Sequence, residues 1–180
     1  MSIRIIAGIF KGRKIKTPKS GSTRPTQAIV REAVFNICQN EIANSKFLDL
    51  YAGSGAVGLE ALSRGAKAAT FIEQDKTALS CIIGNIKLLD LEEKAKVLPL
   101  SLEKGVEKLA RENVTFDLIY IDPPYKAVFN FSLIEALLRE GSLVIYESGT
   151  SYVEKPLQSL NLIVNKKFGA SHVAIFSNSD

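Results

Sequence analysis

From Lys46 onward, short apolar runs alternate with helix-like segments, and this alternation restricts the possible fold more than any other feature of the sequence. Apolar runs that predict strands occur at 46–51, 68–74, 96–100, 116–122 and 142–147. Helical spacing of apolar residues occurs between them, at 56–65, 76–90, 103–112 and 130–139. Repeated strand–helix units are typical of a mostly parallel sheet with helices on both faces. Two more apolar runs, 160–168 and 172–177, predict an antiparallel C-terminal hairpin at the sheet edge.

The first 44 residues differ from this alternating part in pattern and in charge. Residues 3–17 predict a β-hairpin, and residues 26–43 predict a helix with Thr26 as its N-cap. The first 31 residues contain 8 of the 23 lysines and arginines and none of the 19 acidic residues, so the remaining 149 residues contain 15 basic and 19 acidic ones. A basic segment on a mildly acidic body favours a nucleic-acid partner, although a solvated surface gives the same charge pattern.

Composition excludes several classes of protein. The chain has two cysteines, Cys38 and Cys81, and one histidine, His172, which argues against a zinc site and favours structural roles for all three. No run reaches the roughly 20 apolar residues of a membrane span, and charges interrupt the N-terminus before signal-peptide length. We therefore expect one cytoplasmic, metal-free domain over residues 1–180, with a basic extension at 1–44 and a core at 45–180.

The segment from Asp49 to Gly58 is rich in glycine and lies where the first core strand meets a helix. Glycines there let a ligand approach the main chain closely, and Glu73 ends the next strand, where a carboxylate can accept hydrogen bonds from ribose hydroxyls. A nicotinamide dinucleotide site or a tight turn without ligand would show the same glycines. Asp49 just before the loop favours a ligand that carries a cation, such as a sulfonium with an amino-acid tail.

The tetrad Asp122-Pro123-Pro124-Tyr125 directly follows the predicted strand 116–122. The exocyclic amine of a base is a poor nucleophile because its lone pair is delocalised into the ring. A carboxylate and a backbone carbonyl that accept its N–H groups would localise the lone pair, while prolines stiffen the loop and the tyrosine stacks on the base. The tetrad therefore indicates methylation of an amine, although an Asp-Pro-Pro turn that only ends a strand is the structural alternative.

The segments RIIAG, TRPT, LDLYAGSGAVGLEALSRGA, FDLIYIDPPY and KKFG resemble the RsmD family over nearly the whole chain. The resemblance implies a Rossmann-like class I methyltransferase fold with a seven-stranded, mostly parallel sheet. It also implies methyl transfer from S-adenosylmethionine (AdoMet) to N2 of a guanine in 16S ribosomal RNA, in the helix 31 loop, by a cytoplasmic monomer without metal. The partner would be the rRNA, within the small subunit or its assembly intermediates, and S-adenosylhomocysteine the product.

The same resemblance implies a set of site residues. AdoMet would be bound by Asp49, Tyr51, Gly53, Gly55, Glu73 and Ser101. The residues that bind the guanine and promote its methylation would be Asp122, Pro123, Pro124 and Tyr125. RNA would be bound by Arg4, Lys11, Arg13, Lys14, Arg24 and Arg31. The chain departs from many relatives in two places: an acid that would bind adenine is missing around Ser101, and Glu147-Ser148 replaces Glu-His.

Three other functions remain open at this point. A DNA adenine-N6 methyltransferase would use the same tetrad, but 180 residues leave no room for a separate target-recognition domain. A protein-glutamine methyltransferase is a weaker alternative, because such enzymes typically have asparagine at the position of Asp122. A non-catalytic RNA-binding protein would use the basic extension to bind RNA and would not need to bind the cofactor.

Overall fold

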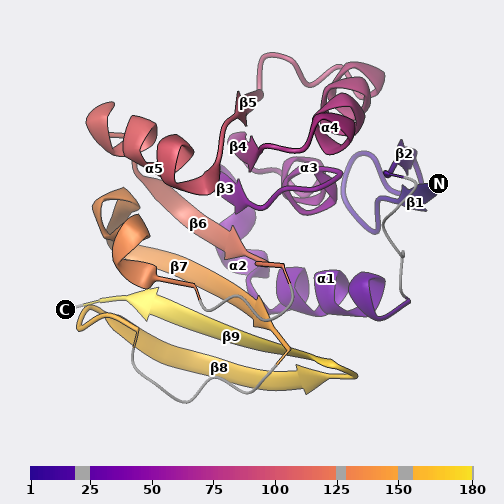
Figure 1. Ribbon diagram of the computed structural model, residues 1–180. Coiled ribbons are helices and arrows are strands. Elements are labelled where there is room, and N and C mark those ends of the chain that lie inside the picture. Colours follow the sequence, from indigo (N-terminus) through magenta and orange to yellow (C-terminus); the bar gives the residue numbers. More distant parts are fainter. Residues whose placement is uncertain (19–24, 125–128, 150–155, 180) are drawn as a thin grey trace.

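The computed structural model describes residues 1–18, 25–124, 129–149 and 156–179 and contains a seven-stranded sheet in the order β5-β4-β3-β6-β7-β9-β8 (Figure 1). Its strands are β3 (Lys46–Leu50), β4 (Ala68–Glu73), β5 (Ala95–Pro99), β6 (Phe116–Ile121), β7 (Leu138–Ser148), β8 (Leu160–Phe168) and β9 (Ser171–Asn178). Strands β3 to β7 pair in parallel, and β9 pairs antiparallel with β7 and β8. The predicted Rossmann-like sheet and its C-terminal hairpin are confirmed.

The helices are α1 (Pro25–Ile37), α2 (Gln39–Ile42), α3 (Ala56–Ser63), α4 (Lys76–Leu88), α5 (Leu102–Arg111) and the 3₁₀ helix η1 (Phe131–Leu137). The prediction of Thr26 as an N-cap is wrong, because α1 already begins at Pro25; proline suits a first helical turn, where its missing N–H has no partner to lose. The predicted helix 26–43 is interrupted at Cys38. None of the helices in the described ranges is long and apolar enough to cross a membrane.

Two apolar cores lie on opposite faces of the sheet, because successive side chains of a strand point to opposite sides. In β6, Leu118 and Tyr120 belong to the core that contains residues of α1 to α4, while Ile119 and Ile121 belong to the core under α5 and η1. Figure 1 shows α5 on the far side of the sheet from α1. Burial on both faces explains why the parallel strands are continuous apolar runs rather than alternating ones.

The winding of the sheet reverses at β3, and this reversal creates the place where a ligand can bind. Strand β3 pairs with β4 on one side and with β6 on the other, and the intervening helices therefore diverge to opposite faces. Open parallel sheets bind their ligands in the crevice at such a switch point, at the carboxyl ends of the strands. Asp49 of β3 pairs in register with Tyr120 of β6, so the glycine-rich segment and the Asp122 tetrad emerge next to each other.

A separate two-stranded hairpin, β1 (Ser2–Arg4) and β2 (Lys14–Lys16), precedes α1 and confirms the predicted N-terminal hairpin. The loop between its strands packs against the end of α3. Buried Glu60 accepts the N–H groups of Ile6 and Ala7 at 2.8 and 2.9 Å, and the Ser63 carbonyl oxygen accepts that of Ile9 at 2.9 Å. The basic hairpin is therefore fixed to the core through a charged side chain that is fully buried.

Two glycines of this loop provide a matched test of that docking. Gly8 and Gly12 both have φ of +82°, but a Cβ on Gly8 would lie 1.8 Å from the Ser63 carbonyl oxygen, whereas one on Gly12 would meet nothing within 4 Å. We expect Gly12→Ala to lower the free energy of unfolding by about 1–2 kcal/mol through backbone strain, and Gly8→Ala to cost about 1–3 kcal/mol more through the clash. Equal losses in urea unfolding would show that the loop does not pack on α3.

Candidate functional site

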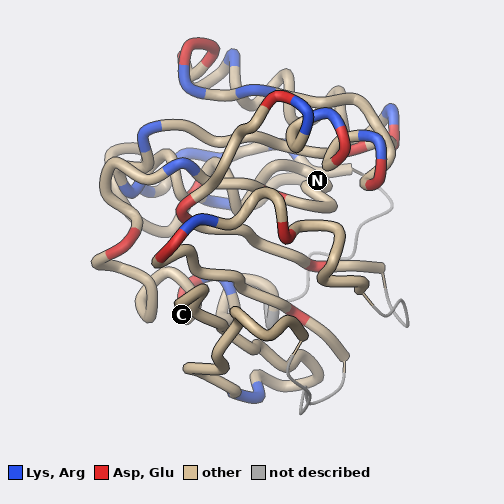
Figure 2. Tube along the Cα trace, turned by 90° about the vertical axis from the view of Figure 1, so that its left-hand side faces the viewer, with Lys and Arg blue, Asp and Glu red and all other residues tan. Residues whose placement is uncertain are grey.

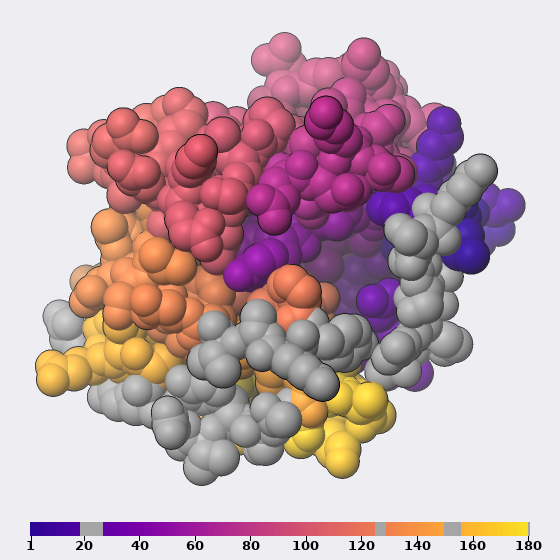
Figure 3. All heavy atoms as spheres, in the orientation of Figure 1, coloured from indigo at the N-terminus to yellow at the C-terminus, as the bar shows by residue number. Residues whose placement is uncertain are grey.

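A cavity of about 630 Å³ opens at the carboxyl ends of β3 and β6, a volume within the range of about 300–1,000 Å³ that is usual for small-molecule sites. The sheet side of the cavity consists of Asp49, residues 51–54, Tyr120, Asp122 and Glu147. Its other wall comes from β1 and α1. In Figure 3 this face of the molecule is hollowed between the purple centre and the indigo N-terminal segment. The hairpin is thus part of the cavity as well as a surface appendage.

The glycine-rich loop has the backbone conformation that glycine favours. Gly53 and Gly55 have φ of +56° and +77°, and Tyr51 is also left-handed at +61°. A Cβ on Gly55 would lie 3.3 Å from the side chain of Ile82, while one on Gly53 would meet only the Tyr51 carbonyl oxygen, at 3.9 Å. A side chain at position 55 would therefore crowd Ile82, and Gly53 presents main chain without a side chain to the cavity that it lines.

Asp49 lines the cavity and also holds the start of α3. Its carboxylate, only 2% exposed, accepts the N–H of Gly58 at 3.0 Å. Burial raises the pKa of Asp49 to about 7; the Gly58 hydrogen bond opposes this rise and the charge of Glu73 adds to it. A cationic group in the cavity would favour the ionised form of Asp49.

Glu73, at the end of β4, holds the glycine loop through a hydrogen bond to its main chain. One carboxylate oxygen accepts the N–H of Gly53 at 2.8 Å, and the other accepts those of Gln74 and Asp75 at 2.8 Å each. The cavity lining includes neither Glu73 nor Ser101, which immediately precedes α5. The structure thus brings Asp49, Tyr51 and Gly53 to the cavity and places Gly55 and Glu73 against the same loop.

Asp122 directly follows β6 and faces the cavity. Its side chain is accessible through the cavity, yet the surrounding protein removes part of its water. This desolvation, followed by the charges of Glu147 and Asp49, raises the pKa of Asp122 to about 7. Pro123 and Pro124 continue the chain outside the cavity lining, and Tyr125 lies outside the described residues. Asp122 is therefore poised to change its charge near neutral pH.

Two cavity residues, Tyr120 and Glu147, were not predicted as site residues. The Tyr120 hydroxyl donates to Oε2 of Glu147 at 2.6 Å, and both side chains are buried. Burial, then the charges of Glu147 and Asp122, raise the pKa of Tyr120 well above its usual value, so the phenol keeps its proton. The signal in the sequence was weak: each residue lies near the carboxyl end of a mostly apolar run, as other polar residues of these strands also do.

The six basic residues predicted to bind RNA fall into different environments. Arg4 and Arg31 line the cavity, and Arg24 lies outside the described residues. Arg31 is 7% exposed, donates to the Arg4 carbonyl oxygen at 2.8 Å and lies 3.7 Å from Glu60, so it holds α1 against the hairpin. Desolvation lowers the pKa of Arg31, and the charge of Glu60 opposes that shift.

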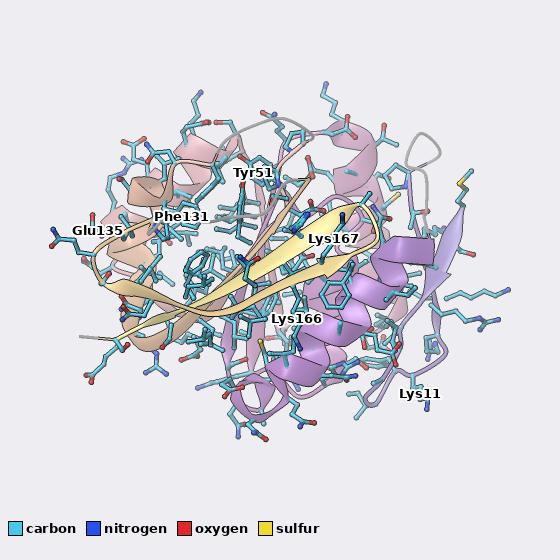
Figure 4. All side chains as sticks on the ribbon, turned by 90° about the horizontal axis from the view of Figure 1, so that it is seen from below. Lys11, Tyr51, Phe131, Glu135, Lys166 and Lys167 are labelled. Carbon is cyan, nitrogen blue, oxygen red and sulfur yellow. The ribbon has the colours of Figure 1, made fainter. Side chains whose placement is uncertain are left out.

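The other three, Lys11, Arg13 and Lys14, are exposed and outside the cavity lining. Figure 4 shows Lys11 at the outer end of the hairpin, well away from Tyr51. Elsewhere charges are mixed: in Figure 2, lysines and arginines intersperse with acidic residues over the upper part of the molecule. The hairpin therefore carries basic charge that neighbouring acids in the sequence do not balance.

Asn85 of α4 joins the hairpin to the glycine loop, a role that the sequence did not reveal. Its amide oxygen accepts the Lys16 N–H at 2.7 Å, and its amide nitrogen donates to the carbonyl oxygens of Lys16 and Ser54 at 2.9 and 3.1 Å. Asn85 is fully buried. A polar residue on the apolar side of a predicted helix was the available signal.

The cysteines differ in their surroundings. Cys38 is 1% exposed, and burial raises the pKa of its thiol to about 12, so it is not a thiolate at neutral pH. Cys81, for which the sequence favours a structural role, is only half-buried. Among the described residues, no group of three or more His, Cys, Asp and Glu side chains is arranged to hold a metal ion.

Comparison with known proteins assigns the family. Residues 3–177 match the family model described as Conserved hypothetical protein 95. The chain is 36% identical to ribosomal RNA small subunit methyltransferase D of Escherichia coli over 87% of this chain and 76% of that protein, and 36% identical to the protein of the same name from Haemophilus influenzae over 98% and 94%. The solved structure of yhhF from Escherichia coli superposes with a TM-score of 0.89 at 30% identity, covering 99% of both chains. The chain belongs to the RsmD family of methyltransferases.

Proposed function

We propose that this protein transfers a methyl group from AdoMet to the exocyclic N2 of a guanine in small-subunit ribosomal RNA. The observation that carries the proposal is the position of Asp122: it faces the same cavity as the glycine loop, at the switch point of the sheet. The curated relatives named above are small-subunit rRNA methyltransferases, which supports RNA as the substrate. We further propose that the target guanine lies in the helix 31 loop of 16S rRNA, because the sequence resemblance implies that position.

The residues around the glycine loop fit AdoMet, which would supply an electrophilic methyl group on its sulfonium. Bare main chain at Gly53 allows close approach of the amino-acid part, and Asp49 favours a cation beside it. Glu73 holds the Gly53 N–H and would accept the ribose hydroxyls by sharing its carboxylate oxygens. Tyr51 and Ser101 would border the ligand on the side of β5 and α5, although Ser101 provides no carboxylate for the adenine amine.

Asp122 and the main chain after it would activate the guanine amine. An ionised Asp122 accepts one N–H of the amine and the Pro123 carbonyl accepts the other, which draws the nitrogen toward tetrahedral geometry. AdoMet would supply the methyl group, and its sulfur would keep the electron pair of the broken C–S bond when the amine nitrogen takes the methyl. The amine proton then passes to Asp122. The protein contributes positioning and electrostatic stabilisation, and Tyr125 would stack on the base.

Activity should therefore depend on the ionisation of Asp122. Because its pKa is raised to about 7, the acceptor form is lost as the pH falls through 7, and transfer should fall with it. We expect the rate at saturating AdoMet to rise about tenfold for each pH unit below this value and to level off above pH 8. The measurement is single-turnover methylation between pH 5.5 and 9. A midpoint near pH 4 would show that desolvation and the neighbouring carboxylates do not raise the pKa of Asp122 in the working enzyme.

The hairpin would bind the RNA backbone. Replacing Lys11, Arg13 and Lys14 together by glutamine should weaken RNA binding and lower the slope of log affinity against log salt by about 2 to 3, since each phosphate contact releases a counterion. Lys67, Lys94 and Lys104 are exposed on other parts of the surface, and their triple glutamine variant is the matched control. A salt slope equal to that of the control would exclude the hairpin as the phosphate-binding surface.

The substrate class is tested by offering tritiated AdoMet with four polymers: small-subunit particles without the modification, naked 16S rRNA, 23S rRNA and duplex DNA. The proposal predicts label in particles or 16S rRNA and none in the other two. Label in DNA would support the adenine-N6 alternative. AdoMet binding without label in any polymer would contradict an RNA substrate, and RNA binding without AdoMet binding would support the non-catalytic alternative.

A further inference from the structure

Glu147 and Asp122 lie side by side at the carboxyl ends of two parallel strands. Ile121 of β6 pairs with Tyr146 of β7, so the next residue of each strand occupies the next position of the register. Ile121 and Tyr146 both belong to the core under α5 and η1, so alternation directs Asp122 and Glu147 to the opposite face, which carries Tyr120. Both carboxylates line the same cavity. A base held by Asp122 would therefore also lie next to the carboxylate of Glu147.

The orientation of Glu147 is fixed by a buried donor. Tyr120 donates to its Oε2 at 2.6 Å, and the two side chains are 3% and 8% exposed. Within the described part of the chain, no residue donates a hydrogen bond to the second oxygen, Oε1. The phenol thus holds one carboxylate oxygen in place and leaves the other as an acceptor in the cavity wall.

The arginines of the cavity wall are engaged elsewhere. Arg4 donates from Nη1 to the Gly12 carbonyl oxygen at 2.7 Å, and Arg31 pairs with Glu60 and the Arg4 carbonyl oxygen. Neither forms an ion pair with Glu147 in the described structure. A buried carboxylate whose acceptor capacity is incompletely used is costly, and a ligand that brings an N–H donor relieves that cost. The cavity therefore favours a ligand with a donor beside the group that Asp122 holds.

Guanine has such a donor, because its N1–H lies next to the N2 amine on the same edge. Adenine and 2-aminopurine instead present a lone pair at N1, and 2-aminopurine keeps the N2 amine. We propose that Glu147 is a specificity-determining residue that accepts the N1–H of the guanine whose N2 amine is held by Asp122. This inference rests on the proposed function and adds how the site distinguishes guanine from bases that lack N1–H.

The test uses RNA fragments that carry either guanine or 2-aminopurine at the mapped methylation site, introduced by ligation and assembled into particles if naked RNA is inactive. We expect wild-type kcat/KM to be about 100-fold lower for 2-aminopurine, because Glu147 then faces a lone pair. Glu147→Gln gives position 147 an amide donor. It should lose activity on guanine and gain on 2-aminopurine, so that the ratio between the two falls below about tenfold.

Two further variants separate recognition from stability. Glu140→Gln removes a carboxylate from an exposed position of the same strand and should keep the wild-type ratio. Tyr120→Phe removes the hydroxyl that orients Glu147, so the ratio of kcat/KM for guanine to that for 2-aminopurine should fall partly. Its affinity for AdoMet should stay unchanged. Because wild type alone provides the first comparison, equal wild-type activity on both bases would overturn the inference even if Glu147→Gln did not fold.

The outcomes distinguish this inference from the function on which it rests. Wild type that methylates N2 of guanine while Glu147→Gln keeps the full discrimination against 2-aminopurine would contradict the role of Glu147 alone. Wild type that leaves guanine N2 unmethylated in every RNA would contradict the proposed function, and the inference would fall with it. A reduced ratio in Glu147→Gln and an unchanged ratio in Glu140→Gln would support both.

Discussion

Asp122→Ala should reduce methyl transfer by about 10³-fold or more and leave AdoMet affinity within about threefold of wild type. The variant removes the carboxylate that accepts the amine hydrogen, an interaction that matters in the transition state, and leaves Asp49, the glycine loop and Glu73 unchanged. Single-turnover transfer and calorimetric titration with AdoMet measure the two quantities separately.

Asp122→Asn provides the graded comparison for this experiment. Asparagine keeps one acceptor oxygen but has no negative charge and cannot take the amine proton, so we expect its activity to lie between those of wild type and Asp122→Ala. At saturating AdoMet, whose cation would keep Asp49 ionised, its residual rate should also lose the dependence on pH near 7, since the carboxyl of Asp122 is gone. A large loss of AdoMet affinity with little loss of transfer at saturation would assign Asp122 to cofactor binding instead.

Glu73→Ala should show the opposite division of effects, with AdoMet affinity lowered by about 10- to 100-fold. A carboxylate that accepts hydrogen bonds contributes about 1.5–3 kcal/mol for each strong bond, and Glu73 also holds the Gly53 N–H at 2.8 Å. Transfer at saturating AdoMet should fall much less, because Glu73 is not near the amine in this account. Calorimetry and the AdoMet dependence of the transfer rate provide the two readouts.

The controls for Glu73 address its contacts to the main chain. Glu73→Gln keeps one acceptor oxygen for the loop and removes the charge, so it should bind AdoMet more tightly than Glu73→Ala. Glu92→Ala removes a carboxylate from an exposed position outside the cavity lining and should leave the affinity unchanged. An unchanged dissociation constant for Glu73→Ala would remove Glu73 from the cofactor site.

The sequence predicts the fold well because local patterns determine most of it. Continuous apolar runs and helical spacing of apolar residues identify the β-α alternation, and the glycine loop and the Asp122 tetrad mark the ends of β3 and β6. The Cα register then places these two ends together, as the structure shows through the pairing of Asp49 with Tyr120. The errors lie at the start of α1 and in the segment 130–139. That segment was predicted as a helix, but its 3₁₀ helix ends at Leu137 and β7 begins at Leu138, before the predicted strand 142–147.

The contacts that shape the cavity could not be predicted in the same way, because they join residues far apart in the chain. The hydrogen bond from Tyr120 to Glu147 depends on the pairing of β6 with β7. The role of Glu60 depends on how the hairpin docks on α3. Arg31 illustrates the consequence: the resemblance includes it among the RNA-binding residues, and the structure shows in addition that it is buried against Glu60.

The most direct measurement of the central claim is the identity of the methylated nucleoside. Small-subunit particles without the modification are incubated with AdoMet and either wild type or Asp122→Ala, and the digested RNA is analysed by mass spectrometry against nucleoside standards. We predict N2-methylguanosine in the wild-type reaction and none above background with Asp122→Ala. N6-methyladenosine, or N2-methylguanosine formed equally by both proteins, would contradict the account.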